Sequence, residues 1–233
     1  MKWIVILIGL TFITAMDCLA FGDSTLRKKD LRRDILLKTD SGDVRIRLSD
    51  STPLHRNNFL KLVKVGYFDG LLFHRVINHF MIQSGDPDSR NAAAGKPLGE
   101  GGPPYTIPAE FRTTLFHHRG ALGAARDNNP EKASSASQFY LVQGKVFTDA
   151  ALDSVEQFRL EGRKIPAAQR EVYKTIGGTP HLDQRYTVFG EIIEGYEVVE
   201  RIAAARTSKD IDLDRPLTDI HIVSAKLVKR KRH

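Results

Sequence analysis

Residues 73–86 hold the side chains of the sequence that are best suited to chemistry. Two short apolar runs lie in this stretch, and Arg75 and Gln83 are their isolated polar members. A guanidinium stays charged at any working pH and donates several hydrogen bonds, so Arg75 could stabilise an acceptor that develops during a reaction without exchanging a proton. The plainer interpretation is that Arg75 is a surface strand residue whose aliphatic stem covers its neighbours.

A β-hairpin is the element that must position these side chains. If residues 78–80 form a three-residue connection, Ile77 pairs with Met81 and Arg75 pairs with Gln83. The two-residue period of a strand then puts Arg75, Met81 and Gln83 on one face. A two-residue connection would break that grouping.

The stretch resembles the F-H-R-V-I-x-x-F-M-x-Q-x-G-D signature of cyclophilins, the β-barrel peptidyl-prolyl cis-trans isomerases. Further resemblances follow in order, at residues 105–111 (YTIPAEF), 120–125 (GALGAA), 137–141 (SQFYL) and 180–190 (PHLDQRYTVFG). Together they cover about residues 34–228. They imply a closed eight-stranded antiparallel β-barrel with two capping helices.

The resemblance also implies a reaction, which is rotation about an X-Pro amide, and a set of site residues. Arg75 and Gln83 would be catalytic, with Arg75 donating to the prolyl nitrogen and Gln83 orienting Arg75. The implied substrate-binding residues are Phe80, Met81, Ala125, Tyr140, His181, Leu182 and Tyr186. His181 replaces the tryptophan associated with cyclosporin binding, and the hydroxyl of Tyr140 needs a hydrogen-bond partner.

Two functions fit this site, an isomerase and a proline-peptide-binding chaperone with little or no turnover. The expected partners of either are proline-containing peptides and unfolded or folding proteins, and we expect a monomer. No cofactor is expected. The sequence has no HExxH pair, no P-loop lysine and hydroxyl after its glycine-rich stretch, and no GxSxG elbow, so a metal, nucleotide or covalent mechanism is not indicated.

The remaining patterns predict how the chain is organised around the hairpin. Residues 34–49 form a first hairpin, Thr52 caps a helix that starts at Pro53, and residues 86–108 form a long surface loop. Residues 134–136 are a flexible lead-in to a strand, residues 197–205 form a second helix, and residues 220–228 form a closing strand. Residues 147–178 read as a helical insertion whose apolar stripe packs on the barrel.

The two ends of the sequence bear on localisation. Residues 1–20 have the charged start, short apolar centre and small-residue exit of a secretory signal, which predicts export to the periplasm or the medium. An uncleaved signal or a lipid on Cys18 would instead tether the protein to a membrane. Residues 21–33 read as a polar linker. The basic tail, residues 229–233, is expected to be solvated. No nucleic-acid recognition motif accompanies it, so specific binding of a nucleic acid is not expected.

Overall fold

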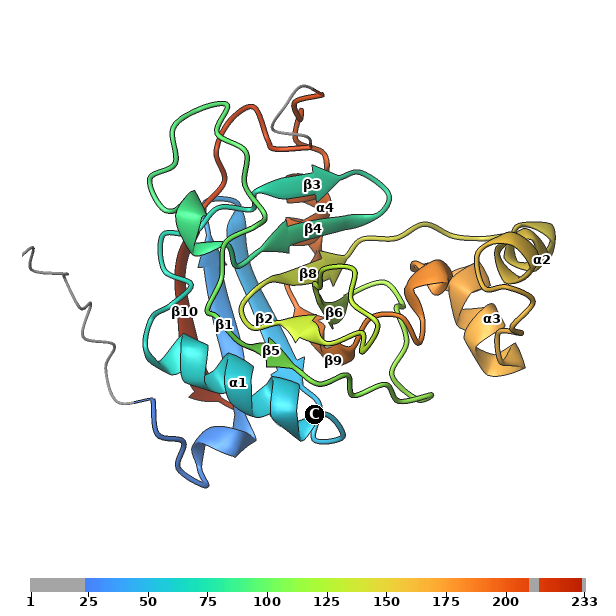
Figure 1. Cartoon of the computed structure of the whole chain (residues 1–233), viewed down its shortest axis with the longest axis horizontal. Helices are drawn as coiled ribbons and strands as arrows, with labels where there is room; N and C mark the ends of the chain where they lie inside the picture. Colours follow the sequence, from blue (N-terminus) through green and yellow to red (C-terminus); the bar gives the residue numbers. More distant parts are fainter. Residues whose placement is uncertain (1–23, 210–213, 232–233) are drawn as a thin grey trace, which may run out of the picture.

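An eight-stranded antiparallel sheet dominates the computed structural model, which describes residues 24–209 and 214–231 (Figure 1). The strands lie in the order β10, β1, β2, β9, β6, β8, β4, β3. Their bounds are β1 Arg33–Thr39, β2 Gly42–Leu48, β3 Arg75–Ile77, β4 Met81–Ser84, β6 Ala121–Ala124, β8 Phe139–Val142, β9 Val188–Glu194 and β10 Ile222–Lys229. The predicted signal peptide and Cys18 lie outside the described residues.

The inner face of the curled sheet follows the two-residue period of its strands. In β2, Val44, Ile46 and Leu48 are buried while the residues between them are not, and Ile35 of β1 lies opposite Ile46. The first predicted hairpin is therefore confirmed. Helix α1 (Pro53–Lys64) packs on β9 and β10, and helix α4 (Tyr196–Ala203) packs on β2, β3 and β4, so the two helices cover different parts of the sheet (Figure 1).

The barrel closes at a seam rather than through a ladder between its two terminal strands. Among the described residues, Leu72 forms an isolated antiparallel bridge with His221. The Phe73 amide donates to the Ile220 carbonyl at 2.9 Å, and the Ser84 hydroxyl donates to the Leu72 carbonyl at 2.8 Å. In the described part of the chain, β3 pairs with β4 and with no other strand.

Helix α1 is capped differently from the sequence prediction. The hydroxyl of Thr52 finds no hydrogen-bond partner in the described part of the chain. Instead the buried Glu110 carboxylate accepts from the backbone amides of Leu54 and His55 at 3.2 and 2.9 Å, and from His55 Nδ1 at 2.8 Å. A negative charge at a helix N-terminus satisfies free amides and complements the helix dipole.

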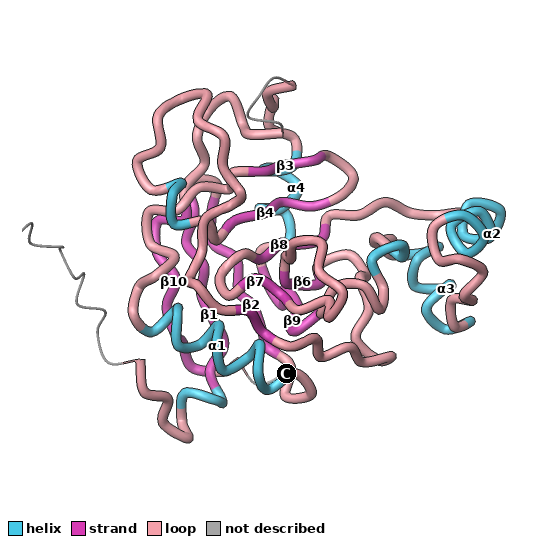
Figure 2. Tube along the Cα trace, in the orientation of Figure 1, coloured by secondary structure: helices cyan, strands magenta, loops and turns pink. Residues whose placement is uncertain are grey.

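Two short paired strands, β5 (Thr106–Ile107) and β7 (Ser134–Ser135), lie in segments that were predicted to be irregular. Residues 134–136 begin with strand β7, which pairs with β5, and the Ser134 hydroxyl lies 2.9 Å from His55 Nε2. This lead-in is therefore an ordered element. The long loop before β5 is otherwise irregular, apart from a 3₁₀ turn at Pro87–Ser89, as the loop trace in Figure 2 shows.

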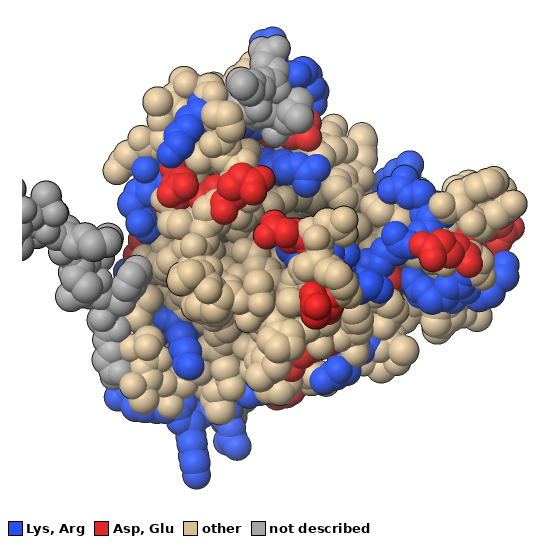
Figure 3. Space-filling view, in the orientation of Figure 1, with Lys and Arg blue, Asp and Glu red and all other residues tan. Residues whose placement is uncertain are grey.

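Two helices, α2 (Asp149–Phe158) and α3 (Ala167–Thr175), occupy the segment read as an insertion and project to one side of the barrel (Figure 1). Their apolar side chains form a separate small core, rather than packing on the barrel strands as predicted. Its members are Leu152, Leu160, Ile165 and Tyr173, closed by Phe116, Phe147 and Val155. The buried Glu156 carboxylate accepts from Lys164, Arg170 and the Ile165 amide. Figure 3 shows the resulting mixture of both charges on this projection.

Both ends of the domain are held more firmly than their sequences suggest. Asp30, in a 3₁₀ turn at Asp30–Arg32, is buried and accepts from the Arg27 amide at 2.9 Å. At the other end, the Lys231 amide donates to the buried Asp34 carboxylate at 3.0 Å, and the Lys231 side chain pairs with Glu194. The basic tail is thus partly neutralised by the barrel as far as Lys231.

Candidate functional site

The hairpin β3–β4 has the register that the sequence predicted. Arg75 lies opposite Gln83 and Ile77 opposite Met81, with residues 78–80 as the connection. His79 adopts a positive φ of 61°, as three-residue hairpin connections require of one residue. This register places Arg75, Met81 and Gln83 on the same face.

A chain of side-chain amides holds the polar end of this face. Arg75 donates to Gln83 Oε1 at 3.4 Å, and Gln83 Nε2 donates to Gln138 Oε1 at 3.0 Å. Gln138 Nε2 in turn donates to the carbonyls of Gly99 and Gly101 at 2.7 and 2.9 Å. The amide orientation of Gln83 is therefore fixed, with its oxygen toward the guanidinium.

Arg75 still keeps donor capacity toward solvent. Its side chain is 43% exposed, and Asp214 is a second polar neighbour, with Oδ2 at 3.8 Å from Arg75 Nε. A carboxylate at that distance helps to orient the cation without covering it. The guanidinium can therefore donate to a bound molecule.

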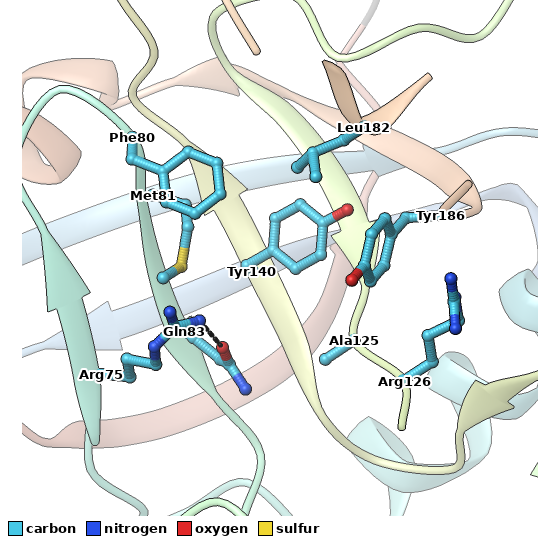
Figure 4. A pocket seen from close by; sticks show the side chains of 9 residues that line it. All are labelled: Arg75, Phe80, Met81, Gln83, Ala125, Arg126, Tyr140, Leu182 and Tyr186. Carbon is cyan, nitrogen blue, oxygen red and sulfur yellow. Dashed lines mark hydrogen bonds between the residues drawn. The ribbon is translucent and has the colours of Figure 1, made fainter. Parts of the chain in front are cut away.

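A cavity of about 150 Å³ lies beside Arg75 and combines this polar end with an apolar floor. Its lining residues are Arg75, Phe80, Met81, Gln83, Ala125, Arg126, Tyr140, Leu182 and Tyr186. Figure 4 shows Arg75 and Gln83 at one end and Tyr186 and Arg126 at the other, with the Tyr140 ring between them. Residues from β3, β4, β8 and three connecting segments thus converge on one cavity.

Strand pairing explains why these distant segments meet. Gln83 of β4 lies opposite Tyr140 of β8, and Tyr140 lies opposite Gly123 of β6. The Tyr140 ring then stands edge-on to Tyr186, with the ring centroids 6.2 Å apart at an interplanar angle of 81°. Burial raises the pKa of Tyr140 well above its ordinary value, so this phenol stays neutral.

The hydroxyl of Tyr140 has the hydrogen-bond partner that the sequence analysis required, and that partner is His117. It lies 2.8 Å from His117 Nε2, and His117 Nδ1 lies 2.8 Å from Asp183 Oδ1. His117 was not predicted as a site residue. Its role beside Tyr140 has no local sequence signal, because the two residues are brought together by the fold.

His181 is the one predicted substrate-binding residue outside the cavity lining. Its ring stacks on the lining residue Phe80 at a centroid distance of 5.4 Å. Burial lowers the pKa of His181 to about 4, which keeps the ring neutral near pH 7. A neutral ring can pack on Phe80 without bringing a buried charge to the site.

Arg126 lines the cavity and was not predicted as a site residue. Its guanidinium lies over the Tyr186 ring at 4.7 Å from the centroid, and its Nε donates to the Arg185 carbonyl at 2.9 Å. Its place directly after the small-residue segment 120–125 was the one available signal. The cavity therefore has a cation at each end.

A metal site and a membrane-spanning helix are both absent from the described residues. No group of three or more histidine, cysteine, aspartate or glutamate side chains is arranged to hold a metal ion among residues 24–209 and 214–231. Across the same residues, no helix has the length and apolar character needed to span a bilayer.

Comparison with known proteins agrees with the fold. The family described as "Cyclophilin type peptidyl-prolyl cis-trans isomerase/CLD" matches residues 35–227. A Staphylococcus saprophyticus protein named as a peptidyl-prolyl cis-trans isomerase is 35% identical over 195 residues, which cover 83% of this chain and 91% of that protein. A Streptococcus pyogenes protein named as a bifunctional phosphatase/peptidyl-prolyl cis-trans isomerase is 36% identical over 191 residues, but the chain spans only 37% of its length.

Solved structures support the same fold. A Cryptosporidium parvum cyclophilin-type peptidyl-prolyl cis-trans isomerase superposes with a TM-score of 0.60 at 21% identity, covering 85% of this chain and 99% of that one. The chain belongs to the cyclophilin-type peptidyl-prolyl cis-trans isomerase family. It is an isomerase of the peptide bond that precedes proline.

Proposed function

We propose that the cavity holds the proline of an X-Pro segment in exported client proteins, and that Arg75 and Gln83 catalyse rotation of the preceding amide. The uncatalysed barrier of about 18–20 kcal/mol arises from amide resonance. Catalysis must therefore favour the twisted state, in which that resonance is lost. Lowering the barrier by about 7 kcal/mol would speed the rotation by about five decades.

The single observation that carries this proposal is the position of Arg75 beside an apolar cavity. As the prolyl nitrogen pyramidalises, its lone pair becomes a hydrogen-bond acceptor. The guanidinium of Arg75 is partly exposed and is held through Gln83, so it can donate to that lone pair. No proton or covalent bond is exchanged.

The apolar part of the cavity suits the proline ring. Met81 and Tyr140 are almost fully buried and give the site a dry floor, while Phe80 and Leu182 are half-buried at its walls. Ala125 has a small side chain that leaves room for substrate backbone. A related C. parvum cyclophilin, with a TM-score of 0.59, was solved in the presence of the dipeptide Ala-Pro, which supports the same class of ligand here.

Substitution of Arg75 tests this assignment. Arg75→Ala should lower kcat/KM on an X-Pro peptide by about a hundredfold or more, the size found when one electrostatic donor is removed. The protein should stay folded, because Arg75 is partly exposed. A protease-coupled isomerisation assay measures the rate, and circular dichroism checks the fold.

Controls separate the catalytic role from a general loss of charge. Arg112→Ala removes an exposed arginine whose Nε donates to the Ser51 carbonyl, away from the cavity, and should leave the rate unchanged. Equal rates for wild type and Arg75→Ala would remove Arg75 from the mechanism. Peptide binding without turnover in the wild type would favour the proline-peptide-binding chaperone.

Export is the remaining part of the proposal, and it rests on the sequence of residues 1–20. Uncatalysed X-Pro exchange takes tens of seconds and limits folding, so an isomerase is useful where exported proteins fold. N-terminal sequencing of the protein from a secreting host should give Phe21 as the first residue. A lipid on Cys18 or an intact residue 1 would contradict cleavage after Ala20.

A further inference from the structure

The floor of the cavity is connected to the helical insertion by an unbroken series of buried hydrogen bonds. Tyr140 bonds His117 at 2.8 Å, His117 bonds Asp183 Oδ1 at 2.8 Å, and the Tyr173 hydroxyl donates to Asp183 Oδ2 at 2.6 Å. Each of these four side chains is 4% exposed or less. Tyr173 belongs to α3, so this relay (Tyr140, His117, Asp183, Tyr173) joins the barrel to the insertion.

The proton positions in the relay follow from its donors and acceptors. The Asp183 carboxylate can only accept, so His117 donates to it through Nδ1, and the His117 backbone amide donates to the same oxygen at 2.8 Å. In a neutral imidazole, Nε2 is then the acceptor, and the Tyr140 hydroxyl must be the donor. The Tyr140 proton therefore points away from the cavity.

This arrangement lets a tyrosine serve as the floor of an apolar site. A buried phenol with a free O–H group would present an unsatisfied donor to an apolar ligand, which is unfavourable. Because the O–H group is committed to His117, the cavity meets only the ring and the oxygen lone pairs. The rings of His117 and Tyr140 are also nearly parallel, with an interplanar angle of 14°.

Asp183 extends the same restraint to a second part of the site. It follows Leu182 directly, and Leu182 lines the cavity wall. The insertion holds Asp183 twice, through the Tyr173 hydroxyl and through Arg163, whose guanidinium donates to the Asp183 carbonyl at 2.6 Å. A shift of α3 is therefore transmitted to both the floor and one wall.

We propose that the insertion is a working part of the proline site, and that Tyr173, Asp183 and His117 are positioning residues that set the place of the Tyr140 ring. The proposal rests on the proposed function, in which Tyr140 floors the substrate cavity. The insertion thus acts on substrate from outside the barrel, without contacting it.

A double-mutant cycle tests the proposal. Tyr173→Phe removes one hydroxyl and keeps the ring that packs on Phe116 and Phe147, so the insertion core should remain. In the otherwise wild-type protein, which retains Tyr140, Tyr173→Phe should lower kcat/KM by about threefold to tenfold, the effect of losing one net hydrogen bond. In the Tyr140→Phe background the effect should be clearly smaller, because that ring is no longer bound to His117 and only the Leu182 wall still depends on Asp183.

A matched control lies on the same helix. The Thr175 hydroxyl donates to the Glu171 carbonyl within α3, on its exposed side. Thr175→Ala removes a hydroxyl from α3 without touching the relay and should leave kcat/KM unchanged in both backgrounds.

Two outcomes would overturn the proposal. One is that Tyr173→Phe lowers activity equally in both backgrounds, which is the result of general destabilisation, and the other is that it has no effect in either. The same four variants can also be compared by the dissociation constant of an Ala-Pro peptide, measured by NMR titration, which does not depend on turnover. A coupling seen in binding together with an inactive wild type would uphold the relay and refute the catalytic assignment of Arg75.

Discussion

Gly123 is the position where a single methyl group should disturb the site most directly. It lies in β6 opposite Tyr140, and a Cβ added there would stand 2.3 Å from Tyr140 Cζ and 2.5 Å from the hydroxyl oxygen. Its φ lies outside the left-handed region, so alanine would not strain the backbone. The whole effect of Gly123→Ala should therefore arise from the Tyr140 side chain.

The size of the displacement follows from these distances. Ordinary contact begins at 3.4 Å, so the tip of the ring must move by about 1.1 Å from its present 2.3 Å. Overpacking of this kind costs about 1–3 kcal/mol, and stretching the 2.8 Å bond to His117 adds about 1 kcal/mol. The free energy of unfolding should fall by about 2–4 kcal/mol. A misplacement of about 1 Å at a substrate-binding group should lower kcat/KM by about a hundredfold.

Urea denaturation and the protease-coupled assay measure the two effects on the same preparation. Gly102→Ala is the matched control, because its added Cβ would lie 3.5 Å from the Ser137 hydroxyl, an ordinary contact, also without a left-handed φ. That variant should match the wild type in both assays. Wild-type activity in Gly123→Ala would refute the inference that the Tyr140 ring must hold its present place.

Two further predictions concern stability. Burial lowers the pKa of His74 to about 4, so between pH 6.5 and 4 this histidine is protonated in the unfolded chain but not in the folded protein. The free energy of unfolding should therefore fall by about 3 kcal/mol as the pH falls through that window. His74→Leu should flatten this pH dependence, as measured by urea titration at several pH values. An unchanged pH slope in His74→Leu would contradict this. Glu110→Gln removes the charge that caps α1 and should lower the free energy of unfolding by about 1–2 kcal/mol. Thr52→Val replaces a hydroxyl that has no partner among the described residues, so it should not destabilise the protein. Equal stabilities for these two variants would argue against the Glu110 cap.

The hairpin of β3 and β4 could be predicted from sequence because its geometry is local. A three-residue connection and the two-residue strand period are enough to set Arg75 opposite Gln83. The same holds for the first hairpin and for the starting point of α1 at Pro53. In each case the deciding residues are neighbours along the chain.

The partners of the site residues could not be predicted, because they come from distant segments. Gln138 reaches Gln83 across 55 positions, and Glu110 reaches the start of α1 from a similar separation. His117 meets Tyr140 only after β6 and β8 have paired. Such contacts leave no periodic pattern in the sequence, and the self-contained core of α2 and α3 was missed for the same reason.

The seam of the barrel has a consequence for motion near Arg75. The guanidinium is carried by β3, which pairs with β4 on one side and, among the described residues, is held on the other side by the backbone hydrogen bond from the Val76 amide to the Asp214 carbonyl at 2.8 Å. The position of the guanidinium also depends on the amides of Gln83 and Gln138. Elements with few backbone restraints open at a lower free energy than the centre of a sheet. The rate of such an enzyme could therefore be tuned at a distance, by an engineered cross-link between the loop that precedes β3 and the start of β10, without altering any group that meets the substrate.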